Sequence, residues 1–203
     1  MVLKCFRKIN ELWTLQKAYK KEGRAIRDED LHLIKDAAIV SVDGVIKWVG
    51  ADSDLNHKVF AELGVKANPQ EYFYKDSVIV PAFVESHTHT VFAGDRSHEF
   101  EMRNQGISYQ EIAAKGGGIL NTVEATRLQS KKGLIELAQK RVNHFVEQGV
   151  CTLEIKSGYG LDEKNEVKIL EVIKELTGPE IIATYLGPHA LAPEFSREEY
   201  QEQ

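Results

Sequence analysis

The sequence has few cysteines and no long apolar run. Only Cys5 and Cys151 are present, so disulfide bonding is limited to one bridge at most. No apolar stretch approaches the roughly 20 residues that cross a bilayer. Arg7 and Lys8 lie where a secretory signal would have its apolar stretch. We therefore expect a cytoplasmic protein with no membrane partner and with both thiols inert in its core.

Positive charge is also not in excess. The chain has 26 Lys+Arg against 31 Asp+Glu, which gives a formal net charge of −5. An acidic chain has no general attraction for nucleic acid, so no such partner is expected. A hydrophobic fraction of 42% with 28% charged residues is typical of a globular protein and excludes a disordered one.

The patterning changes at about residue 76. Residues 1–76 carry strand signals, the clearest being Asp43-Gly44 between two β-branched runs, which predicts a hairpin. From Ser77 onward, apolar strand patterns alternate with amphipathic helix patterns, which predicts an α/β fold with a parallel sheet. The expected strands are 77–84, 150–155 and 181–186, the first of them buried on both faces, and the expected helices are 130–148, 162–176 and a third from 197. Residues 94–127 read as a long polar connection.

Polar residues follow each of the three expected strands. These groups are 85–89, 156–160 and 187–189. Ligands of parallel sheets bind beyond the carboxyl ends of the strands, so we expect these groups to share one site.

His87 and His89 are the sharpest chemical signal. Residues two apart on an extended segment point to the same side, so both imidazoles can reach one metal ion. The alternative is two unrelated histidines in a loop. Their position directly after an apolar strand favours the metal site.

Several sequence blocks resemble a known family. Residues 81–89, Pro-Ala-Phe-Val-Glu-Ser-His-Thr-His, resemble the signature that opens the metal-dependent amidohydrolase superfamily. The blocks at 98–103 and 154–161 narrow the resemblance to the imidazolonepropionase family, and it extends from about Ala37 to Pro193. The chain departs from the family pattern at Ala82, Glu85 and Pro188, none of which is a proposed ligand.

The resemblance implies a fold and a cofactor. Residues 77–203 would be the first three strands of a (β/α)8, TIM-like barrel, and residues 1–76 part of a small β-sandwich domain. One divalent metal, zinc or iron, would bind His87 and His89. The other ligands and the water-activating residue are expected beyond Gln203, so the chain alone would be inactive. The complete enzyme is expected to be a homodimer.

The resemblance also implies a reaction, the hydrolysis of 4-imidazolone-5-propanoate to N-formimidoyl-L-glutamate in histidine degradation. Arg96, Tyr159 and His189 match the family's substrate contacts. A guanidinium presents a planar fork that suits the substrate's propionate. Without the resemblance, these three residues would read as a surface arginine, a half-buried aromatic and a structural histidine.

Two further features allow alternatives. Lys156 would be a carboxylated metal bridge in some amidohydrolases, but we expect a structural ion pair. The run Gly116–Gly118 is equally suited to binding an anion and to a turn.

Two rival functions also stay open: another amidohydrolase, such as a deaminase or a different cyclic-amide hydrolase, and a non-catalytic fragment.

Overall fold

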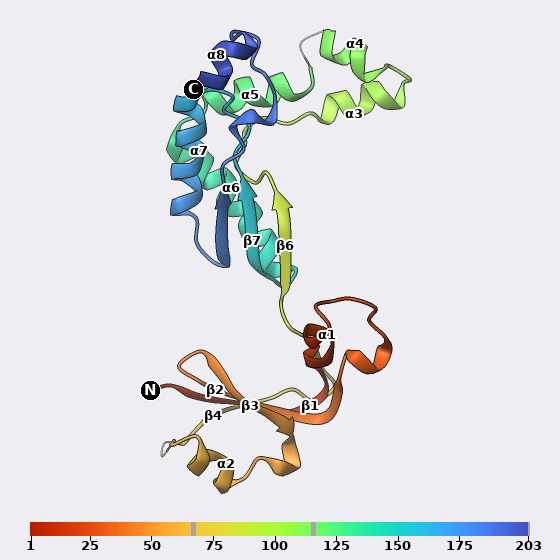
Figure 1. Ribbon diagram of the computed structural model, residues 1–203, viewed down its shortest axis with the longest axis vertical. Helices are drawn as coiled ribbons and strands as arrows, with labels where there is room; N and C mark the ends of the chain where they lie inside the picture. Colours follow the sequence, from red (N-terminus) through yellow and green to blue (C-terminus); the bar gives the residue numbers. More distant parts are fainter. Residues whose placement is uncertain (66–67, 115–116, 203) are drawn as a thin grey trace. The chain divides into compact units, whose positions relative to one another are not determined.

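A computed structural model of the chain describes residues 1–65, 68–114 and 117–202. The chain forms two compact units, Met1–Pro81 and Ala82–Gln203 (Figure 1). No helix in the described ranges is long and apolar enough to cross a membrane.

The first unit is built on one mixed sheet with the strand order β3-β2-β1-β4, and β5 also pairs with β1. The strands are β1 Leu3–Trp13, β2 Leu33–Val42, β3 Val45–Ala51, β4 Gln70–Phe73 and β5 Val78–Ile79. The helical segments are α1 Gln16–Lys20, η1 Asp28–Asp30, η2 Asp52–Asp54 and α2 His57–Glu62. The expected hairpin is confirmed: β2 and β3 pair antiparallel around Asp43 and Gly44, whose φ angles are 49° and 83°.

A buried carboxylate ties η2 to β1. The Asp52 side chain is 2% exposed, and its oxygens lie 2.8 Å from Arg7 Nε and 2.9 Å from Lys8 Nζ. The hydrogen bonds from Arg7 lower the pKa of Asp52 to about 2. The ion pairs thus compensate the burial of this charge beside the apolar residues that fill the unit.

The second unit is a three-stranded parallel sheet in the order β6-β7-β8, which confirms the expected α/β pattern. Its strands are β6 Phe83–Thr88, β7 Val150–Lys156 and β8 Glu180–Thr184. Its helical segments are α3 Ser97–Asn104, α4 Tyr109–Ala114, α5 Ile119–Leu128, α6 Lys131–Glu147, α7 Glu163–Glu175, η3 Gly187–His189 and α8 Arg197–Glu202.

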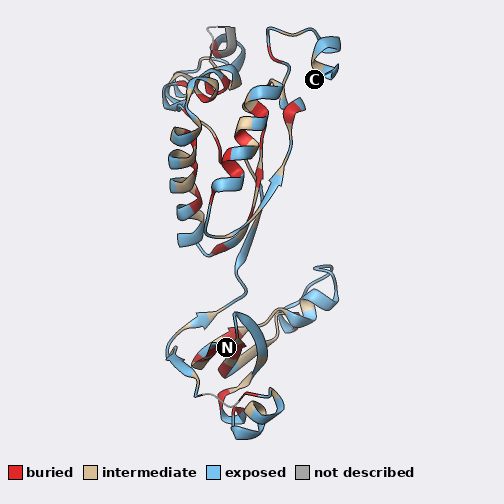
Figure 2. Cartoon of the chain, turned by 90° about the vertical axis from the view of Figure 1, so that its left-hand side faces the viewer, coloured by how far each residue is buried: buried red, intermediate tan, exposed pale blue. Residues whose placement is uncertain are grey.

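Helices α6 and α7 cover one face of this sheet. Leu153 and Ile155 of β7 point to the same face because they are two residues apart, and both are fully buried in a cluster with apolar residues of the two helices. Figure 2 shows the buried residues on the sides of the helices and strands that face each other. Ser130 and Asp162 cap the amino ends of these helices, and the side chain of each accepts a backbone N–H.

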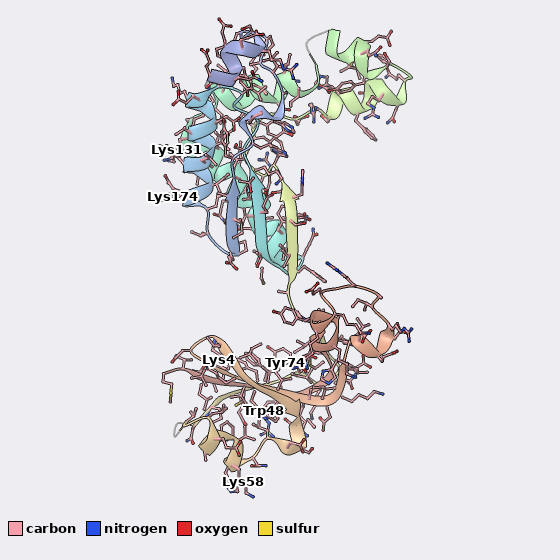
Figure 3. The ribbon with its side chains drawn as sticks, viewed as in Figure 1. Lys4, Trp48, Lys58, Tyr74, Lys131 and Lys174 are labelled. Atoms are coloured by element: carbon pink, nitrogen blue, oxygen red, sulfur yellow. The ribbon has the colours of Figure 1, made fainter. Side chains whose placement is uncertain are left out.

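An ion pair also connects the two helices at the surface. Lys131, labelled in Figure 3, is the first residue of α6. Its ammonium lies 3.1 Å from a carboxylate oxygen of Glu171 and 2.7 Å from one of Glu175, both on α7. The pair is exposed, so the apolar cluster beneath it contributes most of the stability.

The expected strand 77–84 is wrong. Residues 78–79 form β5, which pairs with β1 in the first unit, while residues 83–88 form β6 in the second. Pro81 lies between them and has no N–H to donate to a ladder, so the apolar run divides there. Nor is β6 buried on both faces: Phe83 is 58% and Val84 66% exposed.

The expected polar connection 94–127 is also wrong, because it contains helices α3, α4 and α5. A capping box begins α4: the Ser108 backbone N–H donates to a Glu111 carboxylate oxygen at 2.9 Å, and the Glu111 N–H donates to Ser108 Oγ at 3.2 Å. This Ser-x-x-Glu pattern is visible in the sequence. Cys151 is a further correction, since it is exposed, whereas Cys5 is buried as expected.

The apolar outer strands lead to a prediction about the 203-residue chain. Phe83 and Val84 of β6 and Ile182 of β8, which is 48% exposed, lie on strands with an open edge. Such edges favour pairing between molecules, so we expect the chain to self-associate. Ile182→Lys should shift the chain toward monomer in size-exclusion chromatography with light scattering.

The matched control is Val167→Lys, which changes an equally exposed valine on α7. A monodisperse wild-type monomer with a cooperative thermal melt would contradict the prediction.

Candidate metal and substrate site

The carboxyl end of β6 brings two histidines together. His87 is the penultimate residue of β6, and His89 directly follows the strand. The centroids of the two imidazole rings are 5.8 Å apart. The Thr88 hydroxyl between them points the other way and donates to the Glu154 carbonyl of β7 at 2.7 Å. The alternation of an extended segment thus places both imidazoles on one side, as the spacing predicts.

His89 is the centre of a larger ring cluster. Its ring centroid lies 4.6 Å from that of His189 and 5.2 Å from that of Tyr159, and the last two are 6.0 Å apart. Tyr159 follows β7 and His189 follows β8, so residues from three strand ends meet. Four of the five residues singled out by the sequence therefore lie together: His87, His89, Tyr159 and His189.

His89 is suited to bind a metal in its neutral form. Burial, followed by the nearby His189, lowers the pKa of His89. Its Nδ1 atom is buried and has no hydrogen-bond partner in the described structure. A buried imidazole nitrogen without a hydrogen-bond partner can donate its lone pair to a metal ion when it is not protonated.

The donor set fits a metal only in part. The described residues include no group of three or more His, Cys, Asp and Glu side chains that could hold a metal ion. A catalytic zinc commonly has three protein ligands, so His87 and His89 by themselves would be one ligand short of such a site.

Arg96 lies outside this cluster. It precedes α3, is exposed, and lines a separate pocket with residues of α3 and α4: Glu99, Phe100, Arg103, Tyr109 and Ile112. The structure thus does not bring Arg96 into contact with the histidines.

The glycine run near this pocket has an internal partner. Gly116 lies outside the described residues. The Gly118 N–H donates at 2.8 Å to the carboxylate of Glu99, which is 7% exposed. This N–H therefore binds an anion belonging to the protein itself.

Lys156 forms the expected ion pair. Its ammonium contacts the carboxylate of Glu154, two residues earlier on β7. Since residues two apart share a face of a strand, the pair lies along one side of β7.

The sequence did not reveal the polar residues that hold the strand-end segments. Arg141 of α6 donates from Nη1 to the carbonyls of Thr90 and Phe92 at 2.9 and 2.8 Å, and its guanidinium stacks 3.6 Å from the Phe92 ring centroid. Ser157 Oγ accepts the Leu186 N–H at 2.9 Å. On the helix pattern Arg141 is an ordinary polar position, so no sequence signal marked it.

Comparison with known proteins gives relatives over most of the chain, although no protein-family model matches it. Identity is 51% over 193 residues to the imidazolonepropionase of Bdellovibrio bacteriovorus, covering 95% of this chain and 45% of that protein. It is 45% to the imidazolonepropionase of Shewanella piezotolerans and 46% to that of Pseudomonas syringae pv. tomato, each covering 81% of this chain and 40% of the relative.

Solved structures share the fold at low identity. Ochratoxinase of A. niger matches with a TM-score of 0.50 and 14% identity, over 90% of this chain and 31% of that one. A triazine hydrolase variant matches with a TM-score of 0.51 and 13% identity, over 91% and 36%. These neighbours have the amidohydrolase fold, which confirms the expected fold class: an α/β chain with part of that fold.

The sequence relatives are more specific than the shared fold, because the three given above all have the same name. By sequence, the chain is related over 80–95% of its length to the imidazolonepropionases, of which it spans less than half.

Proposed function

We propose that the protein to which this chain belongs opens the ring of 4-imidazolone-5-propanoate with water, giving N-formimidoyl-L-glutamate in cytoplasmic histidine degradation. The convergence of His87, His89, Tyr159 and His189 at one sheet edge carries the proposal. Similarity to the imidazolonepropionases supplies the reaction. The chain spans under half of those relatives, so the activity is assigned to the complete protein.

In this proposal His87 and His89 hold one divalent metal, zinc or iron. When bound, such a metal lowers the pKa of a water from 15.7 to about 7 and polarises a carbonyl. The unpartnered Nδ1 of His89 supports this role. The remaining ligands and the residue that activates the water are expected outside this sequence.

Tyr159, His189 and Arg96 are the proposed substrate contacts. The phenol and imidazole adjoin His89 and can hydrogen-bond the polar edge of the substrate ring. Arg96 would bind the propionate, and it has no carboxylate partner among the described ion pairs. For it to do so, the substrate carboxylate must lie toward α3.

We also propose a role for each part of the chain. Residues 1–81, which include β5, would form the amino-terminal part of a small β domain, and residues 82–203 the first portion of a metal-dependent hydrolase barrel. The complete enzyme would be a homodimer.

The function is tested by substrate depletion, followed by ultraviolet absorbance, with the complete metal-loaded protein. We expect turnover of 4-imidazolone-5-propanoate but not of dihydroorotate or guanine. Guanine turnover at a comparable rate would favour a deaminase, and no turnover of any of the three would refute the proposal.

Removal of either histidine should empty the metal site. In the complete protein, His87→Ala and His89→Ala should each lose most of the bound metal and nearly all activity, because each removes one metal–nitrogen bond. Elemental analysis measures the metal content. The matched control is His144→Ala on the exposed surface of α6. Full metal occupancy in both site variants would refute the ligand assignment.

Arg96→Lys should reduce kcat/KM although it keeps the charge. Lysine loses the planar two-point contact with a carboxylate, which corresponds to about 1.5–3 kcal/mol of transition-state binding. Arg103→Lys changes another arginine of the same pocket and should have little effect. Unchanged kcat/KM in Arg96→Lys, or an equal loss in the control, would contradict a specific carboxylate contact.

A further inference from the structure

A buried carboxylate lies beneath the loop that carries Tyr159. Glu166 of α7 is 2% exposed. Its Oε1 accepts the N–H groups of Gly160 at 2.7 Å and Leu161 at 2.9 Å, and its Oε2 accepts that of Gly158 at 2.9 Å. None of the ion pairs in the described part of the chain involves Glu166, and its three hydrogen bonds from backbone N–H groups stabilise the buried charge.

The loop backbone fits closely between this carboxylate and His189. A Cβ on Gly160 would lie 2.5 Å from the Glu166 nitrogen and 2.9 Å from Oε1. Gly158 has a φ of +119°, and a Cβ there would lie 3.0 Å from the His189 Cβ. Glycine is therefore required at both positions, on either side of Tyr159.

The two tethered glycines determine where Tyr159 lies. The Tyr159 ring is 5.2 Å from His89 and 6.0 Å from His189, and Phe92 lies 6.0 Å away on another side. Tyr159 is the loop residue whose ring contacts both histidines, while Leu161 belongs to an apolar cluster against which Tyr159 packs. A shift of Gly158 or Gly160 would thus move the phenol relative to both histidines.

We propose that Glu166 is a positioning residue of the site. It does not reach the ring cluster, and it acts by fixing the 158–161 backbone so that Tyr159 and His189 face the same space as His89. The inference rests on the proposed function, in which Tyr159 and His189 contact the substrate. The three N–H groups approach from two directions, two of them toward Oε1 and one toward Oε2. A carboxylate has an acceptor oxygen for each direction, which explains why one is buried here.

Glu166→Gln tests one link of this arrangement. The amide oxygen can keep the bonds from Gly160 and Leu161, but the NH₂ group replaces Oε2 and meets the Gly158 N–H, so two donors face each other. The variant should release Gly158, directly before Tyr159, and retain the other end of the loop. Glu171→Gln makes the same charge change at an exposed position of α7.

The first readout is amide hydrogen exchange in the complete protein. Exchange at Gly158 should be about tenfold faster or more in Glu166→Gln, and unchanged in Glu171→Gln. If Glu166→Gln does not fold, Gly158→Ala weakens the same link from the loop side and should produce the same local increase. Unchanged exchange at residues 158–161 in the folded variant would overturn the proposal.

The second readout is kinetic. Glu166→Gln should raise KM for 4-imidazolone-5-propanoate more than it lowers kcat and should leave the metal content unchanged. In a Tyr159→Ala background the KM effect should become clearly smaller, since Glu166 acts in large part through that side chain. Fully additive effects would overturn the positioning role. If the wild type does not open the ring, the proposed function fails, whereas the exchange comparison still decides whether Glu166 holds the loop.

Discussion

The parallel alignment of β6, β7 and β8 is the constraint on which the site depends. Because the three strands run in the same direction, their carboxyl ends lie at one edge of the sheet, and His89, Tyr159 and His189 meet there from three separate segments. The direction is maintained by helices α6 and α7, which bury Leu153 and Ile155 against one face. An antiparallel neighbour would send one of the three groups to the opposite edge.

Polar side chains of the helices and loops hydrogen-bond to the backbone of the segments that carry the rings, and so fix these segments relative to the sheet. Arg141 of α6 binds the carbonyls after His89, Glu166 of α7 binds the N–H groups around Tyr159, and Ser157 binds the backbone before His189. Each bond satisfies backbone groups that belong to no strand or helix ladder. The site thus has irregular backbone that is fixed by hydrogen bonds from the regular elements.

Helix α5, which follows α3 and α4 between β6 and α6, is joined at its carboxyl end to α7. Lys168 of α7 donates to three carbonyls at the end of α5, those of Thr126, Arg127 and Gln129. These bonds satisfy carbonyls that the helix end leaves free. Arg96 lies at the other end of this helical segment, before α3, which explains why it occupies a different pocket from the histidines.

The sequence by itself determined the hairpin at Asp43-Gly44, the helices that begin at Ser130 and Asp162 and the His87–His89 pair, because each depends on residues near one another in the chain. The alternation of strand and helix patterns also predicted that the sheet is parallel. The sequence did not determine the division of the apolar run at Pro81, the helices within 94–127, the exposure of Cys151 or the position of Arg96. Nor did it mark Arg141 and Glu166, which read as ordinary polar helix positions. Their roles depend on contacts with loops 5 to 51 residues away, and the packing of α6 and α7 on the sheet brings those loops within hydrogen-bond distance.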